Sequence, residues 1–374
     1  MAYTTIDDPS AHFHLQRYTG DGNTNRDITN DANAGDFKPD LHWIKNLTSD
    51  GNNHILSISS LTNDGSKVGH LSTDLSYGEA TATNKVTSFA TDGFRIQNHS
   101  SVNTNNSLYM TWQWKANGGT VANNTDGSIT SSIQANTTAG FSIVKYTGNA
   151  TDNATVGHGL GAVPGWIFLK ELTAGDQLNW AVGHKEYMGE SAENQRLSQS
   201  ALASASSEAG SHWSRNAPTS SVFTLGNGGA GDYSNETNRA SNFIAMCWAP
   251  IQGYSKFSNY KGNGSTSGPF VYLGFKPAWL MIKAEDADEW RLYDNKRSIA
   301  GDGGFNPIDR RIEVHTDDEE YTADGGQTEM DFWANGFKIH SNSGGVNSTN
   351  QLYNYWAFAE HPTQSSKGVP ATAR

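Results

Sequence analysis

Sequence motifs that would place a catalytic nucleophile or acid are few in this chain. The segment Gly264-Ser265-Thr266-Ser267-Gly268 has the glycine spacing of a nucleophile elbow, but threonine occupies the nucleophile position and no strand-to-helix pattern follows. The single cysteine, Cys247, lies in the apolar run 243–248, which favours a buried inert thiol over a nucleophile. Glycosidase carboxylates cannot be paired from sequence, because the separation that matters is spatial. We therefore predict that the protein is not an enzyme.

Histidine and acidic residues supply two weak candidates for a metal site. His12 and His14 would share one face of a strand, and His315 precedes the acidic run 317–320. No second cluster completes the histidine pair, and a block of like charge is typical of a solvated loop. The segment 21–25 resembles a calcium loop only loosely, since it lacks the glutamate at the twelfth position. We expect no metal and no cofactor.

Aromatic residues are the best candidates for binding. They make up 11% of the chain, and exposed rings can stack on sugars while polar side chains bind the hydroxyls. Aromatics at repeated positions, such as Trp112, Trp114, Trp356 and Phe358, are expected to fill cores or interfaces. Four aromatics break the repeat and are our candidates for exposed ligand contacts: Tyr187, Trp213, Tyr321 and Trp333.

The repeat itself is marked by three short segments, 39–45, 164–170 and 277–283. Each begins with proline, continues with an apolar, aromatic-bearing run and ends in lysine, which predicts a buried strand. Each is preceded by a tyrosine-bearing strand and followed by an aromatic one. Three copies in register indicate an internal repeat.

The sequence therefore predicts an all-β protein of three tandem antiparallel β-sandwich domains, jelly-roll-like or lectin-like. Segment 190–209 is the best helix candidate, with a polar loop as the alternative. Within the predicted linker, residues 128–133 could form an edge strand. The short junction after residue 248 suggests that the second and third units pack closely and that the first is free to sit at a different angle. The predicted boundaries are an arm at 1–12, repeats at 13–117, 140–250 and 251–362, a linker at 118–139 and a tail at 363–374.

Charge and hydropathy exclude several classes of protein. The formal net charge is −12 and no basic run is present, which disfavours nucleic-acid binding. No apolar stretch is long enough for a membrane span, so we expect no membrane insertion. The first residues have neither the charged nor the apolar region of a secretory signal peptide.

Several motifs together resemble a family of structural, tail-fibre-like virion proteins of tailed marine bacteriophages, of the cyanophage and pelagiphage type. These are the segments 157–161, 253–257, 335–337 and 355–359, and the opening 4–9. The resemblance implies a non-enzymatic protein displayed on the particle surface, made in the host cytoplasm, with a role in host attachment or assembly. Its partners would be other virion proteins, copies of itself (a trimer, by analogy with fibres) and a host surface glycan.

Two alternatives stay open. A capsid decoration or head-fibre protein should bury its N-terminal arm against the shell, whereas a tail adhesin should expose a groove of aromatic, Asn and Asp side chains. A carbohydrate-binding or polysaccharide-degrading enzyme is the alternative from another class.

Overall fold

The computed structural model is all-β and built from antiparallel sheets, as the sequence predicts. It describes residues 3–31, 37–173, 178–186, 188, 195–197, 212–214, 216–226, 235–285, 290–298, 306–322 and 329–370. Within these ranges the helical segments are single turns: η1 (Pro9–Ala11), α1 (Ser100–Asn103), α2 (Asn235–Asn238) and α3 (Gly344–Asn347). None of the described helices is long and apolar enough to cross a membrane.

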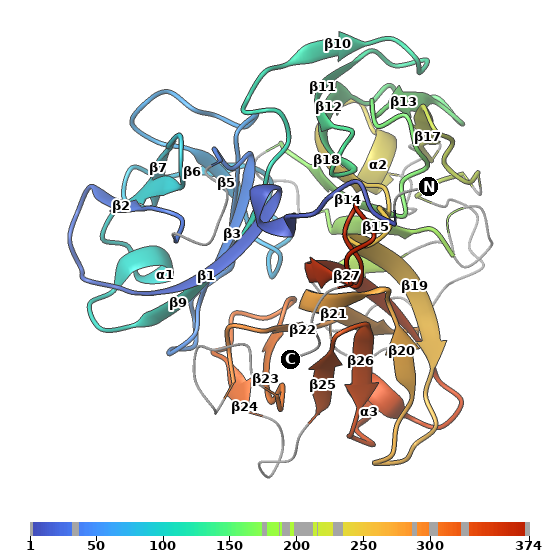
Figure 1. Cartoon of the computed structure of the whole chain (residues 1–374). Helices are drawn as coiled ribbons and strands as arrows, with labels where there is room; N and C mark the ends of the chain where they lie inside the picture. Colours follow the sequence, from blue (N-terminus) through green and yellow to red (C-terminus); the bar gives the residue numbers. More distant parts are fainter. Residues whose placement is uncertain are drawn as a thin grey trace.

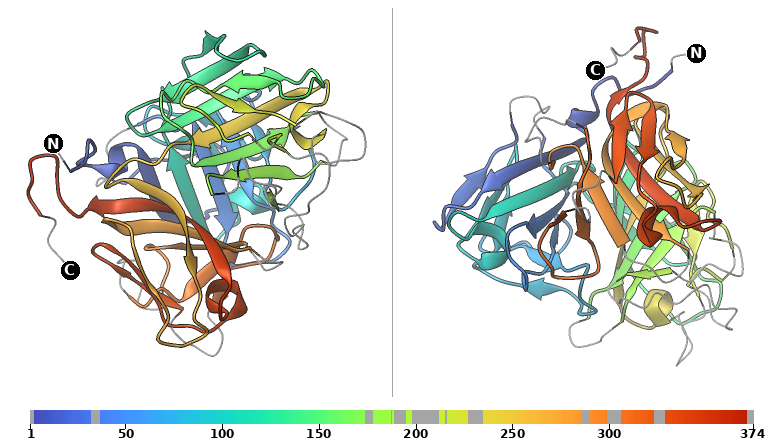
Figure 2. Two further views of the ribbon diagram at one scale, coloured as in Figure 1. Left: turned by 90° about the vertical axis from the view of Figure 1, so that its right-hand side faces the viewer. Right: turned by 90° about the horizontal axis from the view of Figure 1, so that it is seen from below.

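Three large sheets arranged around a common centre make up most of the molecule (Figures 1 and 2). We use lobe 1, lobe 2 and lobe 3 for the elements β1–β9, β10–β18 and β19–β27. In lobe 1 the sheet order is β1 (Phe13–Thr19), β9 (Leu108–Trp114), β3 (Leu41–Asn46), β4 (Ile55–Ile58), β5 (Gly69–Leu71), β6 (Ala80–Thr81). In lobe 2 it is β10 (Ala122–Asn124), β11 (Ser131–Asn136), β12 (Phe141–Thr147), β18 (Asn242–Trp248), β14 (Trp166–Glu171), β15 (Trp180–His184), β16 (Gln195–Leu197). In lobe 3 it is β19 (Ser255–Lys261), β27 (Leu352–Pro362), β21 (Phe275–Ala284), β22 (Trp290–Asp294), β23 (Arg310–Glu313), β24 (Tyr321–Thr322).

A smaller sheet accompanies the large sheet of each lobe. Lobe 1 has β2 (Arg26–Ile28), β8 (Phe94–Ile96) and β7 (Val86–Phe89), and lobe 2 has β13 (Thr155–Gly157) and β17 (Val222–Thr224). Lobe 3 has β20 (Phe270–Tyr272), β26 (Gly336–Ile339) and β25 (Met330–Trp333). Each large sheet packs one face against its own small sheet and buries a separate apolar cluster between them.

The other faces of the three large sheets meet in one central core. The repeated segments 39–45, 164–170 and 277–283 correspond to β3, β14 and β21, with the proline just before β3 and β14 and inside β21. Strands β3 and β14 are buried throughout, because both of their faces are covered. At the centre, the ring of Trp114 lies 5.9 Å from Trp248 of lobe 2 and 6.0 Å from Trp279 of lobe 3, both in edge-to-face contact. Such contacts add to the stabilisation from burying large aromatic surfaces.

Hydrogen bonds to backbone carbonyl oxygens repeat in the same pattern at two of the lobe boundaries. Lys45 Nζ of lobe 1 donates to the carbonyl oxygen of Asp317 in lobe 3 (3.0 Å), and Lys170 Nζ of lobe 2 donates to that of Ser76 in lobe 1 (2.9 Å). Close by, the N–H of Glu320 bonds to the carbonyl of Leu47, and that of Glu79 bonds to Leu172. We refer to these two sets as the lysine clasps. For Lys283 of lobe 3, the corresponding segment of lobe 2 would follow β16 and lies outside the described residues.

The central core corrects two expectations about how the units are joined. Lobe 1 is not free to take its own angle, because Phe13 and Trp114 contact Phe358 of lobe 3 as closely as aromatics do within a lobe. Residues 118–139 are not simply a linker either. They include β10 and β11, and β11 pairs with β12 over residues 132–136 as an edge extension of the lobe 2 sheet. Of the helix candidate 190–209, only β16 falls within the described residues.

Candidate functional site

The residues considered for catalysis and metal binding have structural roles. The segment 264–268 is a loop between β19 and β20, held by Asn347, whose side chain bonds to Asn263 and to the Ser265 carbonyl. Cys247 is fully buried, and burial raises the pKa of its thiol. His14 Nε2 lies 3.0 Å from Gln16 Oε1, while His12 packs edge-on against Tyr254. In the described part of the chain, no group of three or more His, Cys, Asp or Glu side chains is gathered to hold a metal ion.

The acidic run 317–320 lies at the boundary between lobes 1 and 3. The Asp317 carbonyl accepts from Lys45, the Glu319 N–H donates to Asp50 (2.8 Å), and Glu320 binds Arg297 (2.9 Å). Asp317 and Glu319 make these contacts through backbone groups, whereas Glu320 makes its contact through the carboxylate.

The four aromatics proposed as exposed contacts have different outcomes. Trp213 is wrong as a surface residue: it is 1% exposed and packs against Phe223 in the lobe 2 core. Trp213 does not occupy one of the repeated positions because the core of lobe 2 differs there from the cores of the other lobes. Tyr187 lies outside the described residues. Tyr321 is half-buried, donates to Asp318 (2.8 Å) and lies under the guanidinium of Arg311 (5.0 Å). Trp333 is exposed, with 48% of its surface accessible.

Trp333 belongs to a group of three exposed aromatic side chains on lobe 3. Phe270 and Tyr272 are 41% and 53% exposed, and the Phe270 ring centroid lies 5.6 Å from that of Trp333. All three are on the outer face of the small sheet, since the intervening residues Val271 and Phe332 point into the core. We term Phe270, Tyr272 and Trp333 the aromatic platform.

Strand register explains why the aromatic platform is open. Gly336 is paired with Tyr272 on one side and with Trp333 on the other, so the middle of this row has no side chain. A Cβ at Gly336 would come within 3.0 Å of Phe270 Cζ, so the ring lies over the glycine. In the next row, Phe270, Lys338 and Asp331 are neighbours, and Asp331 pairs with His340 Nε2 at 3.0 Å. Polar groups therefore border the rings.

Two further polar contacts hold Tyr272. Lys256 Nζ lies 5.5 Å from the centre of its ring and donates to its carbonyl oxygen (2.7 Å). Burial lowers the pKa of Lys256. Sequence reasoning missed Phe270 and Tyr272, although their alternation with buried Val271 is the signal of a strand with an aromatic outer face.

The aromatic platform is a feature of lobe 3. The corresponding three-stranded sheet of lobe 1 has an ion pair on its outer face, in which Arg95 Nε and Nη2 bond to the two carboxylate oxygens of Asp27 at 2.7 and 2.8 Å. Gly93 in lobe 1 precedes β8 where Gly336 begins β26 in lobe 3. The scaffold is thus repeated, whereas the outward side chains differ.

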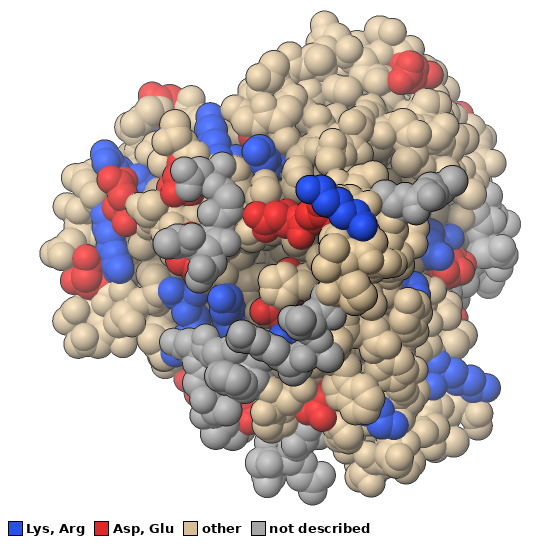
Figure 3. All heavy atoms as spheres, viewed as in Figure 1, with Lys and Arg blue, Asp and Glu red and all other residues tan. Residues whose placement is uncertain are grey.

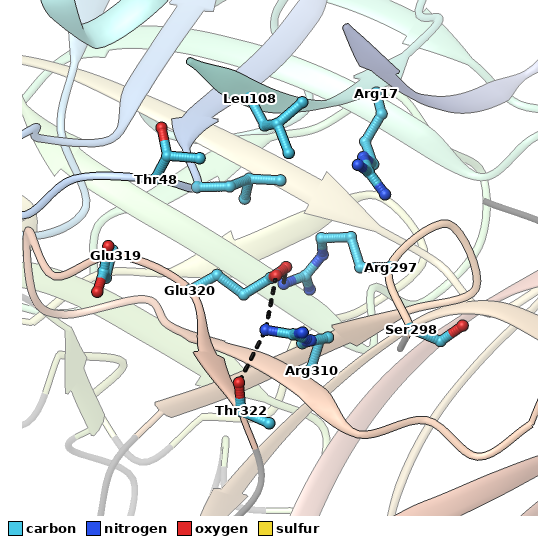
Figure 4. A pocket seen from close by; sticks show the side chains of 10 residues that line it. Arg17, Thr48, Leu108, Arg297, Ser298, Arg310, Glu319, Glu320 and Thr322 are labelled. Carbon is cyan, nitrogen blue, oxygen red and sulfur yellow. Dashed lines mark hydrogen bonds and ion pairs between the residues drawn. The ribbon is translucent and has the colours of Figure 1, made fainter. Parts of the chain in front are cut away.

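A cavity of about 710 Å³ lies between lobes 1 and 3 (Figure 4). Its walls are polar and include three arginines and two glutamates, with Leu47 and Leu108 as the apolar part. Figure 3 shows basic side chains near this boundary, with acidic side chains elsewhere on the same face. The lining residues are Arg17, Leu47, Thr48, Leu108, Arg297, Ser298, Arg310, Glu319, Glu320 and Thr322.

Comparison with known proteins identifies one family. The family described as a domain of unknown function (DUF7483) matches residues 8–362, which is nearly the whole chain. No curated protein and no solved structure matches the chain.

Proposed function

The chain belongs to the DUF7483 family, whose function is unknown, and we propose that it is a non-enzymatic structural protein on the surface of a bacteriophage particle, where it binds a host glycan as a tail fibre or adhesin does. The phage assignment rests on the sequence motifs that resemble tail-fibre-like virion proteins. The glycan-binding role rests on the aromatic platform.

The observation that carries the proposal is the exposure of three aromatic side chains on one face of a small sheet. Large apolar groups at the surface of a folded protein mark interaction sites when they are contiguous. Sugar rings present C–H faces that stack on aromatic rings, while their hydroxyls bond to polar side chains at the border. Asp331, Lys338 and His340 supply such groups beside Trp333 and Phe270.

The N-terminal arm favours an adhesin over a capsid decoration protein. Ile6 is buried in the central core, and Tyr3 OH donates to the Gly274 carbonyl of lobe 3 (2.6 Å). Asp7 also binds the backbone N–H of Ser366 near the C-terminus (2.6 Å). An arm that is packed on its own chain has few groups left to bury in a capsid shell.

The surroundings of the aromatic platform favour binding over hydrolysis. Most glycosidases use two carboxyl groups on either side of the scissile bond. Among the described residues bordering the aromatic platform, we identify one carboxylate, Asp331, and it is paired with His340.

A binding experiment tests the glycan proposal. Labelled protein would be screened against polysaccharides from candidate host bacteria, and positives would be titrated with Trp333→Ala and Phe270→Ala variants. We expect each variant to weaken binding roughly tenfold, as loss of a central aromatic contact does. The matched control is Arg95→Ala on the corresponding sheet of lobe 1, which should bind normally. Equal loss in the control, or release of oligosaccharides during incubation, would contradict the proposal.

Immunogold labelling of intact particles tests the location. Gold at the tail is the expected result, and gold on the head would favour the decoration or head-fibre alternative. We further propose that the chain assembles with itself on the particle, as a trimer by analogy with fibres. Light scattering that finds a stable monomer at high protein concentration would count against that assembly.

A further inference from the structure

We infer that the cavity between lobes 1 and 3 is a binding site for an acidic sugar, whose carboxylate is held between Arg17 and Arg310. This site shares no residue with the aromatic platform, and it goes beyond the proposed function.

Size and position favour a ligand site. A volume of about 710 Å³ falls within the range typical of small-molecule pockets. The walls come from regular strands and the lysine clasp: Arg17 is on β1, Leu108 on β9 and Arg310 on β23, while Glu320 bonds to lobe 1 through its backbone. Side chains on packed strands are held in place more firmly than those on loops.

The arginines have different roles. Arg297 is 1% exposed and fully engaged, with Nε bound to Asp294 (2.8 Å), Nη1 to Glu320 (2.9 Å) and Nη2 to the Leu292 carbonyl (3.2 Å). Its charge is therefore balanced within the wall. Arg310 is more open: it donates to Thr322 (2.8 Å) and lies 3.7 Å from Glu320, which already serves Arg297.

Arg17 and Glu319 lie far apart in the cavity, while the Glu320 carboxylate lies beside both Arg297 and Arg310. Figure 4 shows Arg17 reaching into it from above and Arg310 from below, while Glu319 lies at the opposite end from Arg17. Guanidinium groups bind carboxylates through paired N–H donors, so a carboxylate fits the arginine end. At the other end, Glu319 can accept hydrogen bonds from ligand hydroxyls.

The remaining lining residues suit a hydroxylated ring. The hydroxyls of Thr48, Ser298 and Thr322 can donate and accept, and Leu47 and Leu108 give an apolar surface for a C–H face. A ligand with a carboxylate at one end, hydroxyls along its edge and an apolar face is a uronic acid or a similar acidic sugar. A small inorganic anion would use only the arginine end.

The test uses the full chain and three probes of matched size or charge. Titrations of D-glucuronate, D-glucose and acetate would be followed by ligand-observed NMR. We expect glucuronate to bind more tightly than either of the others, because only glucuronate has both the carboxylate and the hydroxylated ring. The inference is overturned if glucose or acetate binds as tightly as glucuronate, or if glucuronate does not bind at all.

Variants locate the binding. Arg17→Gln and Arg310→Gln should each weaken glucuronate binding about tenfold, as loss of one charge-assisted contact does, with tryptophan fluorescence used to verify folding. Thr48→Val, which keeps every charge, should weaken it less. Arg95→Gln, an exposed arginine elsewhere on lobe 1, is the control and should bind normally. Trp333→Ala should also bind glucuronate normally. A negative result for the cavity is therefore distinguishable from a negative result for glycan binding by the aromatic platform.

Discussion

Lys45 and Asp317 lie 272 residues apart in sequence, and the Nζ of the first donates a 3.0 Å hydrogen bond to the carbonyl oxygen of the second. The same ammonium group donates to the Asn52 carbonyl within lobe 1 (2.7 Å). Burial lowers the pKa of Lys45 to about 8, so at neutral pH these carbonyls stabilise a charge that has little contact with water. Lys45, like Lys170 at the boundary between lobes 2 and 1, therefore joins one lobe to another.

Replacing Lys45 by methionine should destabilise the protein. The change keeps most of the side-chain volume but leaves two buried carbonyl oxygens without their donor, which costs about 1–3 kcal/mol in the free energy of unfolding. Urea denaturation measures this loss. Lys261→Met is the matched control, because Lys261 is exposed at the end of β19. Equal stability of the two variants would show that the clasp contributes little.

Replacing Trp114 by alanine should have a much larger effect than the same change at Trp333. Trp114 is 1% exposed and contacts rings of all three lobes, so its truncation leaves a cavity at the centre, at a cost of about 3–5 kcal/mol. Trp333→Ala should stay within about 0.5 kcal/mol of wild type. Chemical denaturation compares the two, and tryptophan fluorescence and far-UV circular dichroism should report one shared transition. Separate transitions would mean that the lobes unfold independently.

Asp74 gives a prediction for pH. Burial raises its pKa to about 7, against an unfolded value of 3.8. Between these values the folded protein keeps a proton that the unfolded chain has lost, so the contribution of Asp74 to the free energy of unfolding should fall as pH rises from about 4 to 7. Buried histidines such as His42 and His70, whose pKa values burial lowers, contribute with the opposite sign over this range. Asp74→Asn removes the falling contribution, so the stability of the variant relative to wild type should increase with pH by an amount of order 1 kcal/mol after allowance for screening by water.

The measurement for Asp74 is denaturation at several pH values across that window. Asp126→Asn, an exposed change in lobe 2, is the control and should leave the slope as it is in wild type. An Asp74→Asn variant whose stability relative to wild type stays constant or falls as pH rises would contradict the assignment.

Cys247 should be unreactive in the folded protein. Its thiol is buried and its raised pKa leaves almost no thiolate at neutral pH, and the thiolate is the reactive form. Labelling with a thiol reagent should therefore require denaturant and follow the unfolding transition. Rapid labelling under native conditions would show that β18 opens locally.

The fold followed from the sequence where local pattern decides structure. Proline at the start of a strand, alternation of apolar residues and glycine in turns predicted β3, β14 and β21 and the antiparallel all-β class. The packing of the lobes against one another could not be predicted in the same way. The sequence indicates which face of a strand is apolar, but it does not indicate which other element covers that face. Trp114 and Trp356 were expected to fill cores or interfaces, and they lie in the central core, which is also where the three lobes meet.

The candidate site was predicted in part. Trp333 was identified because it breaks the repeat, but Trp213 breaks it equally and is buried. A residue that differs between the repeats can lie in the core of one lobe as well as on its surface. Arg17 and Arg310 could not have been paired, because their meeting depends on how lobe 1 sits against lobe 3. Spatial neighbours that are far apart in sequence carry no local signal.

The aromatic platform of lobe 3 is not repeated on the corresponding sheet of lobe 1, which has an ion pair there, and this difference has a consequence for valency. Three separate subunits with identical sequences would offer three such surfaces, whereas lobes 1 and 3 of this chain offer one between them. If the platform binds a glycan as proposed, firm attachment would come from avidity, set by the number and spacing of copies. Because the three lobes belong to one chain, their outward side chains can differ while the sheets beneath them stay alike. Each lobe could therefore recognise something different.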